Sequence, residues 1–149
     1  MVKVVVQRVL SASVAVDGAT IAHIGKGLAL LVAIHRDDGE QAVDRGVEKV
    51  ASMRIFEDAG GKMNLSARDV GGEMLVVSQF TLYADLRKGR RPGFVEAARP
   101  DRGALLVERF ASRLEAEGYT VGRGRFGAHM LVRIENDGPV TIVLDSRDL

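Results

Sequence analysis

Extended segments rich in β-branched residues constrain the fold of this chain more than any other feature. Residues 2–16 (VKVVVQRVLSASVAV) are typical of a long strand, and Asp17-Gly18 after them is a tight-turn signal. We therefore expect a hairpin whose return strand covers residues 19–25. The continuous apolar run at residues 28–34 (LALLVAI) is typical of a strand buried on both faces.

Only two segments show the periodicity of helices. Apolar residues at positions 43, 47, 50 and 51 share one helical face, and we expect this helix to end near Met53. Asp38, followed three residues later by Gln41, predicts a capping box at its start. In the second segment Pro100 suits the first helical position, positions 106, 110 and 114 form an apolar stripe, and Gly118 is a stop signal.

Three further strands are expected at residues 73–83, 129–135 and 140–145, and two loops at residues 57–72 and 85–93. The order is mainly β, with two helices inserted. It predicts an α+β fold with a mostly antiparallel, barrel-like sheet and a single domain over residues 1–149. Because helices do not separate the strands regularly, a doubly wound nucleotide-binding fold is not expected.

The composition excludes several kinds of function. Lys and Arg total 21 and Asp and Glu 20, so the net charge of +1 rules out a strongly basic nucleic-acid-binding arm and a strongly acidic tail. The absence of cysteine excludes disulfides, a thiolate nucleophile and a Cys-based zinc site. Residues 1–10 lack the features of a signal peptide, and no apolar run approaches about 18 residues, so we expect a cytoplasmic protein without a membrane segment.

Neither a dinucleotide site nor a metal site is expected. Residues 122–127 have the glycine spacing of the dinucleotide fingerprint, but the residues after them are strand-like and do not begin a helix. His23, His35 and His129 are not spaced as metal ligands and are not surrounded by carboxylates in the sequence.

The end of the expected strand at residues 73–83 is unusually polar. Ser78, Gln79 and Thr81 follow a buried apolar run, and on a straight strand Gln79 and Thr81 would share one face while Ser78 and Phe80 share the other. Buried polar groups need partners, so these side chains either form part of a ligand site or satisfy neighbouring backbone groups.

Two loops also leave two interpretations open. Residues 136–139 contain Gly138-Pro139 and predict a plain hairpin turn, although a cis bond or a functional role is also compatible with them. The loop at residues 85–93 is either a solvated surface loop or a grip for phosphates. Its four cations are Arg87, Lys88, Arg90 and Arg91.

Several blocks of the sequence together resemble one family. The two blocks that characterise it are Ser78-Gln79-Phe80-Thr81-Leu82 and Asn136-Asp137-Gly138-Pro139-Val140-Thr141. Shorter blocks agree in the same order: Val6-Gln7-Arg8-Val9, Arg54-Ile55-Phe56 and Lys62-Met63-Asn64-Leu65. Over essentially its whole length, the chain is therefore similar to the D-aminoacyl-tRNA deacylases.

This resemblance implies a homodimer of barrel-like subunits with active sites at the interface. Its implied partner is aminoacyl-tRNA, whose D-aminoacyl ester would be hydrolysed to free tRNA and the D-amino acid, and glycine mischarged on tRNA is implied as a second substrate. The Gly138-Pro139 bond would be cis, and its carbonyls would hold the substrate's α-amino group in the partner subunit's pocket. An L side chain would then collide with this motif.

The resemblance also implies roles for single residues and no metal or organic cofactor. Thr81 matches a threonine proposed as a nucleophile, but a threonine hydroxyl needs a base, and no His or Lys lies near it in the sequence. We therefore favour attack by water, assisted by the terminal 2′-hydroxyl of tRNA. In this mechanism Thr81, Gln79 and the backbone from Ser78 to Phe80 position the ester and stabilise the oxyanion.

Three further positions match residues that bind substrate or support the site. Phe126 and Met130 match the lining of the family's adenine pocket, and Arg8 matches a residue that braces the Gly-Pro turn. Two positions depart from the usual pattern: Gly93 replaces a serine and His129 replaces an aspartate. We expect activity to survive both departures.

Three other functions compete with this one. A sibling deacylase with a trans Gly-Pro bond would accept small L-amino acids. A non-catalytic tRNA- or RNA-binding dimer would bind uncharged tRNA with strong salt dependence. In a purely structural dimer, Gln79→Ala would change stability and nothing else.

Overall fold

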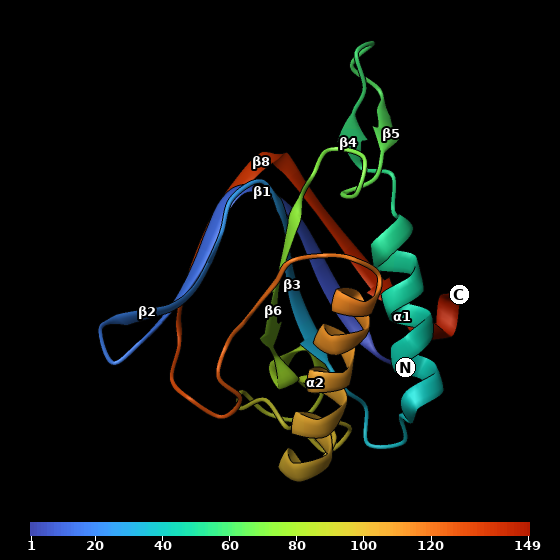
Figure 1. Ribbon diagram of the computed structural model, residues 1–149. Coiled ribbons are helices and arrows are strands. Elements are labelled where there is room, and N and C mark those ends of the chain that lie inside the picture. The colour runs from blue at the N-terminus through green and yellow to red at the C-terminus, as the bar shows by residue number, and fades with distance from the viewer.

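A curled six-stranded sheet with two helices against it makes up most of the molecule, and a small separate hairpin extends from it (Figure 1). The computed structural model describes residues 1–149. Its strands are β1 (Lys3–Val16), β2 (Ala19–Ile24), β3 (Gly27–Ala33), β4 (Phe56–Glu57), β5 (Met63–Leu65), β6 (Glu73–Ser78), β7 (Val121–Arg123) and β8 (Leu131–Asp145). Its helices are α1 (Glu40–Ser52) and α2 (Pro100–Ala116), with the short 3₁₀ turns η1 (Phe80–Tyr83) and η2 (Ser146–Asp148).

The sheet has the order β2-β1-β3-β6-β7, and β8 also pairs with β1. Strand β1 is antiparallel to β2, β3 and β8, whereas β6 is parallel to both β3 and β7. The two parallel pairs follow from the long connections that hold α1 and α2, because parallel neighbours need a crossover. The expected α+β class and the barrel-like, mostly antiparallel sheet are confirmed.

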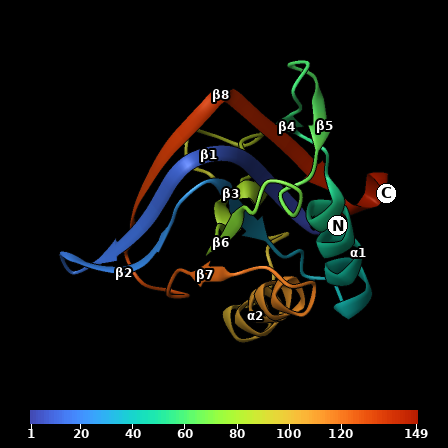
Figure 2. The ribbon, with the colours of Figure 1, turned by 45° about the horizontal axis from the view of Figure 1, so that its top comes forward.

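Two apolar clusters lie on the two faces of the central strands. The larger lies between the sheet and both helices, and includes Val4, Leu30 and Met74 from strands with Val47 and Phe110 from the helices. The smaller cluster takes the alternate residues of β3 and β6, together with residues of β1 and β2 where the sheet curls over them (Figure 2). Strand β3 is therefore buried on both faces, as its sequence predicts.

The hairpin of β1 and β2 and the start of α2 at Pro100 are confirmed. Helix α2 ends at Ala116, with Glu117 as its C-cap, and is followed by Gly118 with φ +99°. The capping box before α1 is wrong. Gly39 is the N-cap and makes no side-chain cap, because the carboxylate of the buried Asp38 accepts the backbone N–H of His35 at 2.7 Å instead.

Two other expectations for local structure are wrong. The loop expected at residues 57–72 contains an antiparallel pair, β4 with β5, at the projecting end of the molecule (Figure 1). Residues 136–139 do not form a hairpin turn between two strands, because β8 is continuous through them. Both halves of β8 pair with β1, and irregular register beside Val9 absorbs the bend. No helix is long and apolar enough to cross a membrane.

Candidate functional site

The polar segment after β6 is a turn and not the end of a long strand. The last sheet hydrogen bond is donated by the Gln79 amide to the Val32 carbonyl at 2.8 Å. The chain then turns into η1, so the expected strand at residues 73–83 ends at Ser78. The argument that alternate side chains share a strand face is therefore wrong. Gln79 and Thr81 still meet, because the Gln79 side-chain amide donates to the Thr81 hydroxyl.

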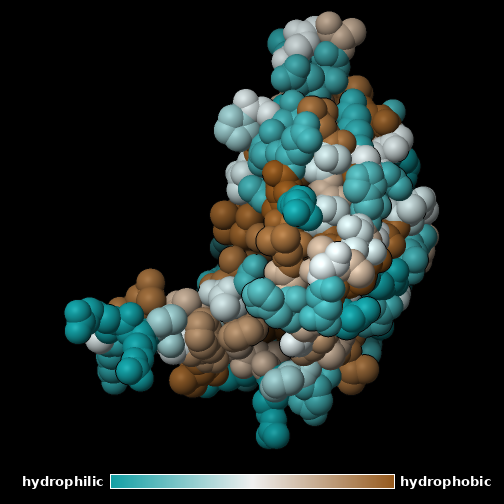
Figure 3. All heavy atoms as spheres, turned by 90° about the vertical axis from the view of Figure 1, so that its left-hand side faces the viewer, coloured by the Kyte–Doolittle hydropathy of each residue, from teal (hydrophilic) through white to brown (hydrophobic).

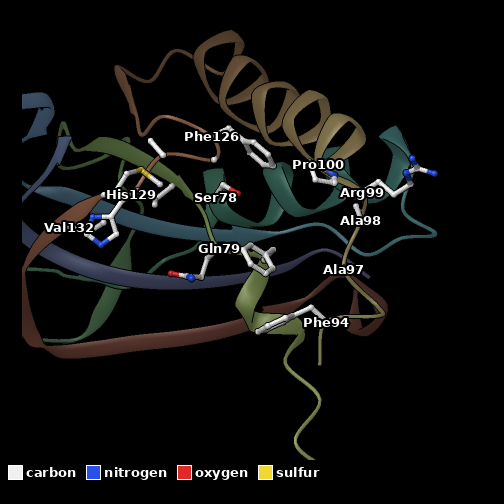
Figure 4. A pocket seen from close by; sticks show the side chains of 15 residues that line it. Ser78, Gln79, Phe94, Ala97, Ala98, Arg99, Pro100, Phe126, His129 and Val132 are labelled. Carbon is white, nitrogen blue, oxygen red and sulfur yellow. The ribbon is translucent and has the colours of Figure 1, made fainter. Parts of the chain in front are cut away.

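A cavity of about 640 Å³ opens beside this turn (Figure 4). Ser78, Gln79 and Phe80 line it, and so do Phe126 and Met130 from the other end of the chain. The structure thus brings together the strand-end motif and the two residues matched to an adenine pocket. Thr81 does not line the cavity and is exposed to solvent next to it.

Phe126 and Met130 reach the cavity because β7 pairs with β6. After β7, the amide of Gly124 donates to the Val76 carbonyl at 2.9 Å, which keeps the chain beside β6. A Cβ at Gly124 would lie 2.7 Å from the Met130 sulfur. A larger residue at position 124 would therefore displace the Met130 side chain from its place in the cavity wall. No helix follows the glycine-rich segment, so it does not suit a dinucleotide.

The opposite wall of the cavity was not predicted from the sequence. It is formed by Phe94, by residues 97 and 98, and by Arg99 and Pro100 at the start of α2. The rings of Phe80 and Phe94 meet edge-to-face, with centroids 5.0 Å apart. The available signal was an aromatic residue directly after a basic loop, but only the fold shows that it faces the strand-end motif.

The turn at residues 136–139 is held by side chains on both sides. Arg8 is buried, with 5% of the residue exposed. Its Nε donates a hydrogen bond to the Asp137 carbonyl at 3.0 Å, and its Nη1 donates one to the Ile55 carbonyl at 2.8 Å. The Asn136 side chain accepts the Val140 amide at 2.8 Å and donates to the Val140 carbonyl. Arg8 therefore contacts the turn as the resemblance implies.

The Gly138–Pro139 bond is cis, which is the geometry the resemblance implies and not that of the trans alternative. Gly138 has φ +143°, and a Cβ there would lie 2.7 Å from Val140 Cγ2. Both Gly138 and Pro139 are exposed, and neither lines the cavity formed by the same chain. The structure thus separates the Gly-Pro motif from the strand-end motif within one subunit.

The basic loop is closed by two backbone hydrogen bonds between Asp85 and Gly93. Arg87 donates two side-chain hydrogen bonds to the Asp85 carboxylate, at 2.9 and 2.7 Å. These bonds lower the pKa of Asp85 to about 2 and leave Arg87 with its charge compensated. The exposed side chains of Lys88, Arg90 and Arg91 make no hydrogen bond or ion pair, so they are the free cations of the loop.

The two unusual positions are easily accommodated. A Cβ at Gly93 would meet no atom within 4 Å, so either glycine or serine fits the loop. His129 is exposed at the rim of the cavity. No three side chains of His, Asp or Glu lie together in a way that could hold a metal ion.

Comparison with known proteins gives consistent matches over the whole chain. Residues 5–145 match the family described as D-Tyr-tRNA(Tyr) deacylase. Proteins named D-aminoacyl-tRNA deacylase from Clostridioides difficile and Thermomicrobium roseum are each 56% identical to this chain. The first match covers 97% of both chains, and the second covers 99% of this chain and 96% of the relative.

Two solved structures have the same fold. A c-Myc DNA Unwinding Element Binding Protein superimposes with a TM-score of 0.89 at 40% identity, over 96% of this chain and 97% of that chain. A probable eukaryotic D-amino acid tRNA deacylase superimposes with a TM-score of 0.83 at 22% identity, over 97% and 98% of the two chains.

Proposed function

The chain belongs to the D-Tyr-tRNA(Tyr) deacylase family, and from this we infer that it hydrolyses the ester bond of D-aminoacyl-tRNA, releasing free tRNA and the D-amino acid. It is a hydrolase that acts on aminoacyl-tRNA. We place the reaction in the cavity that is lined by Ser78, Gln79 and Phe80 together with Phe126 and Met130, and this cavity is the observation that carries the proposal.

We propose that the terminal adenosine lies between Phe126 and Met130, which places the ester beside the turn after β6. The backbone from Ser78 to Phe80, with Gln79 and Thr81, then positions the ester and stabilises the negative charge that develops on its carbonyl oxygen. Water attacks the ester with help from the terminal 2′-hydroxyl of tRNA. The hydrogen bond from Gln79 to Thr81 supports a positioning role, since an amide is not a base that could activate a threonine hydroxyl.

The selection of D over L substrates is proposed to come from Gly138 and Pro139 of a second subunit. Within one chain this turn is exposed, braced by the buried Arg8, and outside the cavity, which suits a rigid motif that acts on another molecule. Its carbonyls hold the α-amino group, so an L side chain collides with the turn. A D side chain or the hydrogen of glycine points away, which also makes glycyl-tRNA a substrate.

A homodimer is required by this proposal. Large apolar side chains are exposed on the same strand that contains the turn: Leu131 is 56% exposed and Val143 is 73% exposed. Figure 3 shows brown patches of hydrophobic residues on the face that lies at the left of Figure 1. Apolar patches of this kind are typical of surfaces that a partner covers.

The test is a paired deacylation assay with D-Tyr-tRNA and L-Tyr-tRNA in the presence of EDTA. Rapid release from the D form alone is expected. Equal release from both forms would contradict the selection mechanism, and release from neither would contradict the enzyme function.

A second candidate is a nucleic-acid-binding protein without catalysis. The free cations Lys88, Arg90 and Arg91 favour it, and one similar structure is named a DNA unwinding element binding protein. This function predicts tight, strongly salt-dependent binding of uncharged tRNA with no release of amino acid.

A further inference from the structure

The cavity continues beyond the part that the terminal adenosine would fill. Figure 4 shows Phe126 and Phe94 at different places in the cavity, Phe126 beside Ser78 and Phe94 beyond Gln79. The proposed adenosine position uses Phe126 and Met130. The cavity also contains the rings of Phe80 and Phe94, which we call the aromatic pair. The proposed reaction uses the backbone at Phe80 but neither of the two rings.

The aromatic pair presents ring surface to solvent inside the cavity. Phe80 is 52% exposed, and Phe94 is partly exposed. The two rings meet at 73°, so the edge of one covers only part of the other and leaves aromatic surface open. A planar apolar ligand group can stack there.

Unpaired cations precede and follow Phe94 in the sequence. Phe94 directly follows the basic loop, whose side chains of Lys88, Arg90 and Arg91 are unpaired. Arg99 lines the cavity at the start of α2, and its guanidinium makes no hydrogen bond or ion pair; Figure 4 shows it directed outward at the rim. Aromatic rings among unpaired cations are the features that bind single-stranded nucleic acid, since bases stack on the rings and phosphates meet the cations.

We propose that Phe94, together with Phe80, forms a second base-binding subsite that takes the penultimate nucleotide of tRNA, next to the terminal adenosine. The subsite rests on the proposed function, which places the adenosine at Phe126. It is continuous with that position because one cavity contains both. The enzyme then recognises the unpaired 3′ end of tRNA through two successive bases, and Arg99 faces the backbone that leads away from them.

The experiment compares three esters of D-tyrosine: adenosine, adenosine 5′-phosphate and the dinucleotide cytidylyl-adenosine. For the unaltered enzyme, kcat/KM should be about tenfold higher for the dinucleotide than for the 5′-phosphate, as expected from one base stacked on an aromatic ring. Phe94→Leu should abolish this difference and leave kcat/KM for the adenosine ester within about twofold. Phe94→Tyr should retain the difference, and Val95→Ala, at a neighbouring side chain that is 76% exposed, is the matched control.

Three outcomes would overturn the subsite. One is an equal loss on all three esters in Phe94→Leu, which would make Phe94 structural. A second is no preference for the dinucleotide in the unaltered enzyme. The third is a loss that is larger for D-Tyr than for D-Ala esters of adenosine, which would show that the aromatic pair binds the amino-acid side chain.

Equilibrium binding of uncharged cytidylyl-adenosine separates this proposal from the proposed function. If no ester is hydrolysed but the dinucleotide binds about tenfold more tightly to the unaltered protein than to Phe94→Leu, the subsite stands and the enzyme function fails. If the esters are hydrolysed and dinucleotide affinity is the same in both proteins, the function stands and the subsite fails.

Discussion

The surroundings of Thr81 determine what its hydroxyl group can do. Its hydrogen-bond partner is the Gln79 amide, and its side chain is exposed beside the cavity. In the proposed mechanism this hydroxyl positions the ester, because no base next to it could activate it as a nucleophile.

Thr81→Ala should therefore retain substantial activity, with kcat for D-Tyr-tRNA within about tenfold of the unaltered enzyme, because losing one positioning contact costs about 1 kcal/mol. Single-turnover deacylation of D-Tyr-tRNA measures this rate. Thr81→Ser is the control, since it keeps the hydroxyl. Complete loss of activity in a folded Thr81→Ala protein would instead indicate a nucleophile.

Arg8 links the Gly-Pro turn to the body of the chain through the carbonyls of Asp137 and Ile55. Replacing it by methionine leaves the Ile55 carbonyl, which it contacts in a buried position, and the Asp137 carbonyl without their donor. We expect Arg8→Met to lower the free energy of unfolding by about 1–3 kcal/mol. It should also raise the activity on L-Tyr-tRNA relative to D-Tyr-tRNA, because the turn loses its brace.

Urea unfolding measures the first effect of Arg8→Met, and paired deacylation assays measure the second. Arg8→Lys should restore part of the stability, since an ammonium can serve one carbonyl but lacks the planar fork that serves both. An unchanged ratio of L to D activity in a clearly destabilised Arg8→Met protein would show that the brace has no part in selection.

At the scale of elements, the basic loop has two ends that are hydrogen-bonded to each other and a middle part whose cations are unpaired. Asp85 and Gly93 close it, and the ion pair with Asp85 holds Arg87 at its start. Replacing Lys88, Arg90 and Arg91 together by alanine should raise KM for D-aminoacyl-tRNA and flatten its salt dependence, while kcat stays the same, because the cations meet phosphates remote from the ester.

Arg87→Ala is the matched control for that triple variant. Its charge is already compensated, so it should change KM less than any single replacement of the three free cations. Steady-state kinetics at two salt concentrations give kcat, KM and the salt dependence of KM. If KM of the triple variant is unchanged at physiological salt, the loop does not contact tRNA.

The elements that the sequence predicts well are those with local causes. The β1–β2 hairpin follows from Asp17-Gly18, and the start of α2 follows from Pro100. The elements that it predicts poorly depend on distant partners. Asp38 is a good helix cap in isolation, but it is buried and bonds the backbone of His35 instead.

The same distinction applies to the candidate site. The motif at residues 78–82 is visible in the sequence, but its turn after Ser78 depends on a hydrogen bond from Gln79 to Val32 in the neighbouring strand. Residues 136–139 have the composition of a hairpin turn and become a bend in one strand because β1 pairs with β8 on both sides of them. Phe94 is not part of any periodic pattern in the sequence. Only the folded chain places it in the same cavity as Phe126.

At the scale of the whole molecule, the cavity and the Gly-Pro turn of one chain lie apart. The cavity lies beside the end of β6, and the Gly-Pro turn is exposed at the bend of β8. If the turn of each subunit completes the cavity of the other, an altered turn and an altered cavity in different subunits should complement each other. Variants for this are Gly138→Val, whose side chain would clash with Val140, and Phe126→Ala, which opens the adenosine position.

Each of these two variants alone should lose most of its ability to hydrolyse D-Tyr-tRNA selectively. When equal amounts are unfolded together and refolded, half of the dimers that form by random pairing contain one subunit of each kind. One of the two sites in each mixed dimer then has an intact cavity facing an intact turn. The mixture should recover about a quarter of the unaltered activity and selectivity.

The control sample contains the same two variants refolded separately and mixed afterwards. It distinguishes a turn that acts on the partner's cavity from a turn that acts on the cavity of its own chain. That sample should remain at the level of the single variants for as long as the dimers do not exchange subunits. If the turn acted on the cavity of its own chain, every subunit in either mixture would contain one defect, and co-refolding would restore nothing. Recovery after co-refolding alone therefore requires sites shared between subunits, and a dimer with two-fold symmetry is an arrangement that gives each cavity the partner's turn.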